Sequence, residues 1–407
     1  MTEEKLKKIM EEKVDFSGRR EEMKKEGKVF LVDVHEKYKK YLHIEDTHRI
    51  DVVLAVALSN KLEGIPLWLI IVGPSGDMKS VQLNSIIGEE VYVLHNLTSK
   101  TLVNGYKDKK KFPDLAPILN GKIVVIPDMA QLLKLPPNEK GELWGQLRDL
   151  YDGLAGKVSG QGSQSKYSGL KITLLAGSTP AIDGQILVHQ DLGTRELIYR
   201  TKGNKNKEKV MEKCFENEEF ESKIKKELSQ ITKEFLEQKE VVRNYIPKET
   251  LIRIMGIARY VSIMRASAEF DSYTHDLRNM VYPEEPTRIA KQLKRLYVCL
   301  TSLSEDYPEE RALEILWEVA RSSCFPLRIK LFDFMLNQNT ELSTSAIAEK
   351  LKIGKSTAKR ELGVFWNLGI INCRKEPTSF PDKFIDYWEV NKGHKFIRIY
   401  EQSRLKI

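Results

Sequence analysis

The sequence predicts an α/β protein whose parallel sheet is followed by a helical region and a basic C-terminal domain. Short, continuously apolar runs alternate with segments of helical periodicity up to about residue 200, which is typical of a parallel sheet covered on both faces. A loop with two glycines follows the first apolar run, and the composition becomes dense in Lys and Glu after Arg200. The expected organisation is a lead-in, a sheet domain, a helical domain and a C-terminal domain over residues 1–46, 47–202, 203–325 and 326–407.

The first predicted elements are a charged helical lead-in, a helix and a buried strand. Residues 1–46 are rich in Lys and Glu, with few apolar anchors. From Thr47 apolar residues recur at helical spacing, so we expect a helix that ends near Gly64. The run from Leu67 to Val72 is apolar at every position, as a central strand buried on both faces requires.

Two further strands and a helical domain follow. The apolar runs Ile123–Ile126 and Ile172–Ala176 predict two more strands of the same sheet. After Arg200, apolar residues mark one face of a long helix, and further helices are expected up to about Ser323. The residues of that face are Ile224, Leu228, Ile231 and Phe235.

The C-terminal domain has the element spacing of a winged helix. Helical patterns cover Leu331–Leu336, Thr344–Leu351 and Lys355–Leu368. We expect them to be followed by two strands, Phe384–Val390 and Lys395–Tyr400. This order of three helices and a strand-rich tail predicts the winged helix.

Composition limits the class of protein. The chain has 407 residues, of which 41% are hydrophobic and 30% charged, with a formal net charge of +8; such a chain is globular and not disordered throughout. Its longest apolar stretches, Val52–Leu58 and Pro66–Val72, are far shorter than the roughly 18 to 20 residues that cross a bilayer. We therefore expect a cytoplasmic protein without a membrane partner. The four scattered cysteines lack CxxC spacing, which predicts neither a zinc site nor a disulfide framework.

The first predicted strand leads directly into a loop with the residue types that bind phosphate. Backbone N–H groups of such a loop can cradle phosphate oxygens, while Lys79 reaches the β and γ oxygens and the Ser80 hydroxyl ligates Mg²⁺. Met78 stands where a glycine usually precedes the lysine. The expected nucleotide-binding residues of this loop are Gly73, Pro74, Ser75, Gly76, Asp77, Met78, Lys79 and Ser80.

Polar residues also follow the other two predicted strands. Asp128 ends the second strand about 50 residues after the loop, where an aspartate can hold Mg²⁺ through water. Met129 occupies the next position, where a glutamate that activates water is usual in such sites, so the general base is missing there. Ser178 and Thr179 end the third strand, and we expect them between the other two strand ends, within reach of the γ-phosphate.

Two arginines are candidates for a role in phosphoryl transfer. Arg195 comes after the third strand and can act in trans, stabilising charge that develops at a neighbouring subunit's site. The alternative for an isolated arginine is a surface salt bridge. Arg288 lies at the start of a predicted helix, from which it can reach back to the nucleotide.

Over residues 47–405 this order of motifs resembles an AAA+ ATPase, and within that group it is similar to minichromosome maintenance (MCM) helicases and related ATPases of mobile genetic elements. That family also replaces the last loop glycine before Lys-Ser. The resemblance implies ATP and Mg²⁺ as cofactors, and a homo-oligomeric ring, a hexamer, as the assembly. It also implies that Asp149 or Asp152 could substitute for the glutamate absent at Met129. The implied roles are phosphate and Mg²⁺ binding for Lys79, Ser80 and Asp128, sensing for Thr179, an arginine finger for Arg195 and a sensor 2 arginine for Arg288.

Two basic segments point to DNA. Residues 153–169 contain five glycines and four serines together with Lys157 and Lys166, a permissive sequence that suits a hairpin projected into a pore. In MCM-like ATPases a hairpin at this position grips DNA, so the resemblance makes these two lysines DNA contacts. The alternative is a disordered surface loop.

The second basic segment is the predicted winged helix, with 15 Lys and Arg against 9 Asp and Glu from Leu327 to Ile407. A recognition helix starting at Lys355 would address the major groove, and its cations and hydroxyls would touch phosphates. The alternative is a protein-binding winged helix. The expected DNA contacts are Lys355, Ser356, Thr357, Lys359 and Arg360 in the helix, and Arg374 and Lys375 in the wing.

These features lead to a DNA-dependent ATPase, a ring-forming helicase or translocase that couples ATP hydrolysis to movement on DNA. A nucleotide-switched initiator, loader or regulator with slow hydrolysis is the alternative. Met129 favours the switch, whereas the hairpin favours the motor. A third possibility is a purely structural DNA-binding protein. It holds only if the loop matches the phosphate-binding pattern by accident.

Overall fold

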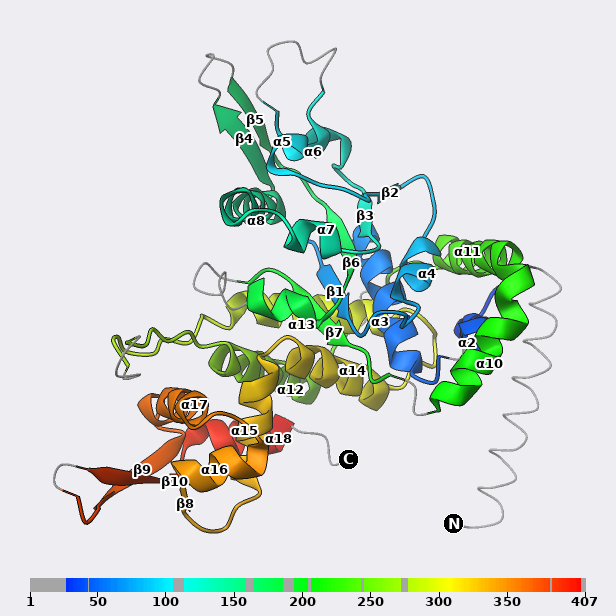
Figure 1. Ribbon diagram of the computed structural model, residues 1–407. Helices are drawn as coiled ribbons and strands as arrows, with labels where there is room; N and C mark the ends of the chain where they lie inside the picture. The colour runs from blue at the N-terminus through cyan, green and yellow to red at the C-terminus, as the bar shows by residue number, and fades with distance from the viewer. Residues whose placement is uncertain are drawn as a thin grey trace, which may run out of the picture.

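Five parallel strands form the centre of the protein in this computed structural model (Figure 1). The structure describes residues 27–42, 44–104, 113–158, 164–185, 194–203, 206–242, 245–271, 277–380 and 383–403. The strands pair in the order β2-β3-β6-β1-β7, and their bounds are β1 Trp68–Val72, β2 Val91–Val93, β3 Ile123–Ile126, β6 Thr173–Ser178 and β7 Leu197–Arg200. The α/β class and the three predicted strands are confirmed. The sequence pattern did not predict β2 or β7.

Helices cover both faces of this sheet. Successive side chains of a strand point to opposite faces, so Leu69 and Ile71 enter one core while Trp68 and Ile70 enter the other. The first core includes α3 (Thr47–Leu58), α4 (Lys79–Asn84), α13 (Thr287–Thr301) and α14 (Glu309–Ser322). The second includes α5 (Ser99–Leu102), α6 (Leu115–Ile118), α7 (Ala130–Leu133) and α8 (Pro137–Tyr151). Short 3₁₀ turns, η1 (Ser59–Lys61) and η2 (Pro180–Ile182), follow α3 and β6.

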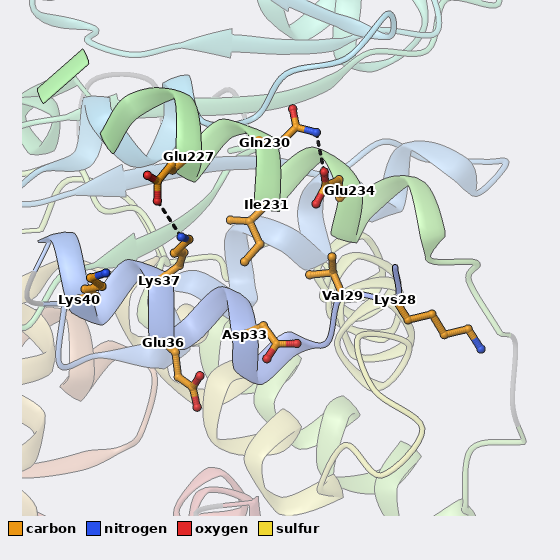
Figure 2. A pocket seen from close by; sticks show the side chains of 10 residues that line it. All are labelled: Lys28, Val29, Asp33, Glu36, Lys37, Lys40, Glu227, Gln230, Ile231 and Glu234. Carbon is orange, nitrogen blue, oxygen red and sulfur yellow. Dashed lines mark hydrogen bonds and ion pairs between the residues drawn. The ribbon is translucent and has the colours of Figure 1, made fainter. Parts of the chain in front are cut away.

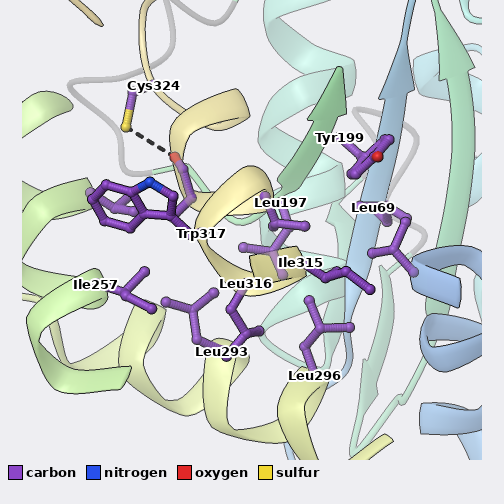
Figure 3. Close-up of a cluster of buried hydrophobic side chains, with 14 of the residues drawn as sticks. Leu69, Leu197, Tyr199, Ile257, Leu293, Leu296, Ile315, Leu316, Trp317 and Cys324 are labelled. Atoms are coloured by element: carbon purple, nitrogen blue, oxygen red, sulfur yellow. Dashed lines mark hydrogen bonds between the residues drawn. The ribbon is translucent and has the colours of Figure 1, made fainter. Parts of the chain in front are cut away.

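The helical region packs directly on the sheet. Figure 3 shows Leu293 and Leu296 of α13 and Ile315 and Leu316 of α14 beside Leu69 of β1 and Leu197 and Tyr199 of β7. The region also contains α10 (Lys207–Asn217), η4 (Glu218–Phe220), α11 (Glu221–Gln238) and α12 (Lys248–Met264). The predicted apolar face of α11 is confirmed, with Ile224, Leu228 and Phe235 buried and Ile231 partly buried. This face lies against α2 (Leu31–Leu42), the part of the lead-in that the structure describes.

The glycine- and serine-rich segment forms a hairpin. β4 (Leu154–Val158) pairs in antiparallel register with β5 (Gln164–Ser168), and this ladder projects away from the five-stranded sheet (Figure 1). The expected hairpin is therefore confirmed over the described residues of this segment.

The C-terminal residues form a small helical and three-stranded unit. Its elements are α15 (Pro326–Leu336), β8 (Leu342–Ser343), α16 (Thr344–Leu351), α17 (Lys355–Asn367), β9 (Ile371–Pro377), β10 (Phe384–Val390) and α18 (Lys395–Ser403). The sheet order is β8-β10-β9. The prediction of a strand over Lys395–Tyr400 is wrong, because this segment begins α18. Phe396, Ile397 and Tyr400 are all buried, a spacing that places them on one face of a helix.

α18 ties this unit to the helical region. It packs on α12, where Gly256 allows close contact: a Cβ at Gly256 would lie 1.8 Å from Ser403 Oγ. Tyr260 of α12 is surrounded by the rings of Trp317, Phe332, Phe396 and Tyr400. The C-terminal unit is thus held by a shared aromatic core. Within the described ranges, no helix has the length and apolar character needed to span a membrane.

Candidate functional site

The loop between β1 and α4 begins with a glycine that is packed tightly against the residue following β7. A Cβ at Gly73 would lie 2.2 Å from Thr201 Oγ1, so a larger residue would have to displace the chain after β7. Met78 has φ of 53°, the left-handed conformation that glycine adopts readily and other residues adopt at a cost of about 1 kcal/mol. The loop therefore keeps the conformation suited to glycine despite its methionine.

Lys79 is the first residue of α4 and points back into this loop. Its Nζ donates hydrogen bonds to the carbonyl oxygens of Gly73 at 2.9 Å and Pro74 at 2.5 Å. Burial lowers the pKa of Lys79, while the nearby carboxylates of Asp77 and Asp128 oppose that shift. The ammonium group is therefore held within the loop, where it can bind an anion.

Ser80 and Asp128 come together at the ends of α4 and β3. The Ser80 hydroxyl donates to the Pro127 carbonyl oxygen at 3.1 Å, and Asp128 is exposed, with one carboxylate oxygen accepting from the Ala130 amide at 2.9 Å. These oxygens are the ligand type that Mg²⁺ prefers. Met129 is buried, and its amide donates to the Gly177 carbonyl oxygen at 2.8 Å, so its side chain belongs to the core.

Thr179 follows the strand that separates β1 from β3. β6 pairs with both of those strands, and the Gly73 amide donates to the Ser178 carbonyl oxygen at 3.2 Å. The expectation that the end of the third strand lies between the other two strand ends is confirmed. Thr179 is half-buried there, beside the loop and the end of β3.

A cavity of about 430 Å³ adjoins the loop. This volume lies within the range of small-molecule sites. Apolar side chains on its wall come from three separate segments: Leu42 and Ile44, Met78 of the loop, and Val210 and Met211 of α10. Sequence patterns did not identify this cavity, because only folding brings α2, the loop and α10 together.

Arg49 fixes the loop to α3 at the wall of the cavity. It is 3% exposed, its Nε donates to Gln82 Oε1 at 2.6 Å, and its Nη1 pairs with Asp77 Oδ2 at 3.4 Å. Burial lowers the pKa of Arg49, and the charge of Asp77 opposes this most strongly. Arg49 and Asp51 are charged residues in a mostly apolar helix, and this is the signal that could have drawn attention to Arg49.

Arg195 and Arg288 lie at the opposite edge of the sheet from the loop. All five strands are parallel, so residues after a strand lie at its carboxyl edge and residues before a strand at its amino edge. Arg195 precedes β7, and Arg288 Nη1 donates to the Thr194 carbonyl oxygen at 3.1 Å. The expectation that Arg288 reaches back to its own chain's nucleotide does not fit this position.

The two aspartates considered as substitute bases lie at that same amino edge. α8 runs back across the sheet after β3, and Asp152 follows its last residue. Asp152 Oδ2 pairs with Arg195 Nη2 at 2.8 Å, and Asp149 lies one turn earlier. Neither carboxylate is therefore placed to activate water at the loop between β1 and α4 of its own chain.

The two hairpin lysines lie on opposite faces of the ladder. Lys157 is opposite Ser165, and Lys166 is opposite Gly156, so the two side chains alternate. Lys157 pairs with Glu142 of α8 at 3.0 Å. Lys166 is exposed on the outer face with Leu154 and Val158, and Val158 is 73% exposed.

The basic residues of the C-terminal unit have different environments. Lys355 and Ser356 are exposed at the start of α17, where Thr357 and Lys359 are half-buried. The Arg360 guanidinium lies over the Phe270 ring, 4.7 Å from its centroid.

In β9, Arg374 is exposed but pairs with Glu341 at 2.8 Å and with Glu376 at 3.3 Å. Lys375 is exposed opposite Asp386 of β10. Arg374 thus has two carboxylate partners, whereas Lys355 is exposed at the start of α17.

Two further clusters of polar residues lie outside the loop between β1 and α4. Ligand atoms of Asp46, His48 and Glu318 lie within 4.8 Å of one another. However, Lys202 Nζ lies 2.5 Å from Glu318 Oε1 and supplies the positive charge that a metal ion would provide. The Tyr199 hydroxyl also donates to Asp46 and Glu318. We assign no metal to this cluster.

The second cluster lines an open groove of about 570 Å³ between α2 and α11 (Figure 2). Lys37 and Glu227 pair across it at 2.7 Å, and Gln230 bonds to Glu234 at 2.5 Å. Its lining mixes basic and acidic side chains, so it does not select an anion or a cation.

The comparisons with known proteins leave the family open. No protein family model and no curated protein matches this sequence. A solved structure described as the A form apo structure of the NrS-1 C-terminal region matches 88% of this chain and 75% of its own, at 10% identity and a TM-score of 0.27. A likeness at this level assigns neither fold nor function.

Proposed function

We propose that this chain is a DNA-dependent AAA+ ATPase that acts as a ring-forming helicase or translocase. The observation that carries the proposal is the placement of the phosphate-binding loop and of Arg195 and Arg288 on opposite edges of one parallel sheet. In a head-to-tail ring of identical subunits, one surface of a subunit contacts a different surface of its neighbour, and we propose that these two surfaces are the two edges of the sheet. Two arginines at the amino edge can then stabilise charge at the neighbour's nucleotide.

Several contacts support ATP with Mg²⁺ as the ligand. The loop has no room for a side chain at Gly73, where a Cβ would clash with Thr201. The ammonium group of Lys79 lies within the loop, where it can bind a phosphate. The adjoining cavity offers an apolar wall for the base. Ser80 and Asp128 would hold Mg²⁺, which when bound would neutralise phosphate charge.

The chain's own residues suggest how hydrolysis would proceed. Lys79 would bind the β and γ oxygens, Thr179 would orient the attacking water, and Arg195 of a neighbouring subunit would stabilise developing charge. Met129 supplies no base, so positioning and electrostatics would carry the catalysis. Turnover would depend on assembly, because the arginine comes from another subunit.

DNA binding is supported by two surfaces. The C-terminal unit has the order helix, strand, helix, helix, strand, strand, helix, and its first six elements agree with a winged helix. Lys355 and Ser356 at the exposed start of α17 would contact phosphates. Lys166 on the outer face of the hairpin would meet a DNA strand in the pore, with Leu154 and Val158 beside it.

A nucleotide-switched initiator, loader or regulator is the second candidate. The buried side chain of Met129 favours it, because a switch tolerates slow hydrolysis better than a motor does. The ion pair of Lys157 with Glu142 also removes one of the two cations expected in the pore.

ATP turnover, measured with and without single- and double-stranded DNA beside the mass of the nucleotide-bound assembly, tests the proposal. Rapid DNA-stimulated turnover in a ring supports the motor, whereas slow turnover that DNA does not stimulate supports the switch. Arg195→Ala should bind ATP but lose turnover. Mixing it with Asp128→Asn should restore part of the activity, because each variant supplies what the other lacks. A monomer with full turnover would contradict the trans-acting arginine.

A further inference from the structure

The end of α8 holds the residues just before β7 through two separate contacts. Asp152 Oδ2 lies 2.8 Å from Arg195 Nη2. The Gln292 amide of α13 donates to the Tyr151 hydroxyl at 2.9 Å and to the Arg195 carbonyl oxygen at 2.6 Å. Both the side chain and the backbone of Arg195 are therefore connected to the last turn of α8.

The same turn is the root of the hairpin. Gly153 has φ of +82°, a conformation that glycine adopts readily, and β4 begins at the next residue, Leu154. Further along β4, Lys157 pairs with Glu142 on α8 at 3.0 Å. The first hairpin strand is thus joined to α8 both covalently and through a side-chain contact, so a force on the strand is transmitted to Asp152.

We infer that Asp152 is a positioning residue that links the hairpin to Arg195. The inference rests on the proposed function, in which the hairpin contacts DNA and Arg195 serves a neighbouring subunit. Without DNA, the Asp152 carboxylate holds the guanidinium and offsets its charge, so less of that charge is available to a phosphate. When DNA loads the hairpin, Asp152 moves with the root of β4 and releases Arg195 to the neighbouring nucleotide.

The exposure of the two partners suits a reversible contact. The Arg195 side chain is 13% exposed, whereas that of Asp152 is 46% exposed. Water therefore reaches the pair from the Asp152 side, and ion pairs with a solvent-exposed partner shift equilibria only by about two- to fivefold. A contact of that strength holds the arginine without preventing its release.

Asp152→Asn tests the link, because it removes the charge and keeps the shape. We expect DNA-independent ATP turnover to rise about two- to fivefold, while the DNA-saturated rate and the KM for ATP stay unchanged. The ratio of stimulated to basal turnover should fall by the same factor. Asp152→Glu, which keeps the charge, should retain much of the wild-type ratio of stimulated to basal turnover.

Asp149→Asn is the matched control, because Asp149 is an exposed aspartate one turn earlier on α8. It should keep the wild-type ratio, and the melting temperatures of all variants should confirm an intact fold. If the wild type shows DNA-stimulated turnover but Asp152→Asn behaves like Asp149→Asn, the link is wrong and the proposed function stands. If the wild type has no ATP turnover, both are overturned.

Discussion

The ammonium nitrogen of Lys79 lies 2.9 Å from the carbonyl oxygen of Gly73, so the loop between β1 and α4 closes on its own lysine. A bound phosphate would take over this lysine, since charged oxygens accept hydrogen bonds more strongly than neutral carbonyls. Lys79→Ala should therefore weaken ATP binding about 10- to 100-fold, the range for a charge-assisted hydrogen bond, and abolish turnover. Titration with a fluorescent ATP analogue measures the loss. Lys248→Ala, at an exposed lysine that begins α12, should bind as the wild type does.

The left-handed backbone at Met78 gives a prediction about loop strain. With φ of 53°, a β-branched residue is much less favourable there than an unbranched one. Met78→Val should lower the free energy of unfolding by about 1 to 2 kcal/mol. Met78→Gly should remain within about 1 kcal/mol of the wild type, because relief of strain offsets the lost packing. Urea unfolding compares the two, and equal losses would show that the backbone conformation is not the cause.

The start of α17 gives a prediction about DNA affinity. If Lys355 and Lys359 contact phosphates, Lys355→Gln and Lys359→Gln should each weaken duplex binding and lower the salt-dependence slope by about 0.9. Basal ATP turnover should not change. Arg374→Gln is the control, since Glu341 and Glu376 already neutralise this arginine. Anisotropy titrations over a series of salt concentrations test this, and an unchanged slope in the α17 variants would make the C-terminal unit a protein-binding module.

Two buried tyrosines should respond in opposite ways to the same substitution. The Tyr38 hydroxyl bonds to Ser85 and to Thr232, whereas the Tyr260 hydroxyl has no hydrogen-bond partner among the described residues. Tyr38→Phe should cost about 1 to 2 kcal/mol of stability. Tyr260→Phe should be neutral or slightly stabilising, because it removes a buried polar group that has no partner. Chemical denaturation measures both, and a large loss in Tyr260→Phe would indicate a bonded hydroxyl.

The central strands were predictable because a strand that is buried on both faces has apolar residues at successive positions of the sequence. β1 and β3 are continuously apolar, β6 is buried at every position around an apolar centre, and the loop follows the first of these strands directly. β2 has only three residues and is partly exposed, and β7 ends in Arg200, so neither forms the continuously apolar run by which the similarly short β3 was recognised. In α18 the polar and apolar residues of Lys395–Tyr400 suggest a strand, yet Phe396, Ile397 and Tyr400 all pack toward α12.

The sequence predicted only those site residues that directly follow a predicted strand. Ser80 contacts Pro127, the residue before Asp128, because α4 begins at the same edge of the sheet where β3 ends. The position of Arg288 depends on how α13 packs against the chain before β7, which no local pattern encodes. The cavity wall likewise combines residues from α2, the loop and α10. These features depend on contacts between segments that are distant in the sequence, and such contacts leave no local pattern from which to predict them.

The contact between Gly256 and Ser403 predicts a reversal of the usual effect of alanine in a helix. Inside a helix Gly→Ala normally stabilises by about 1 kcal/mol, and Gly141→Ala in α8 should do so, because nothing lies within 4 Å of its added Cβ. At Gly256 the Cβ would lie 1.8 Å from Ser403 Oγ and 3.0 Å from Ser403 Cβ, so α18 must shift. We expect Gly256→Ala to lower the free energy of unfolding by about 1 to 2 kcal/mol, measured in urea. Adding Ser403→Gly removes both clashing atoms and should recover most of that loss; a stable Gly256→Ala single variant would mean that α18 does not pack against α12 in this register.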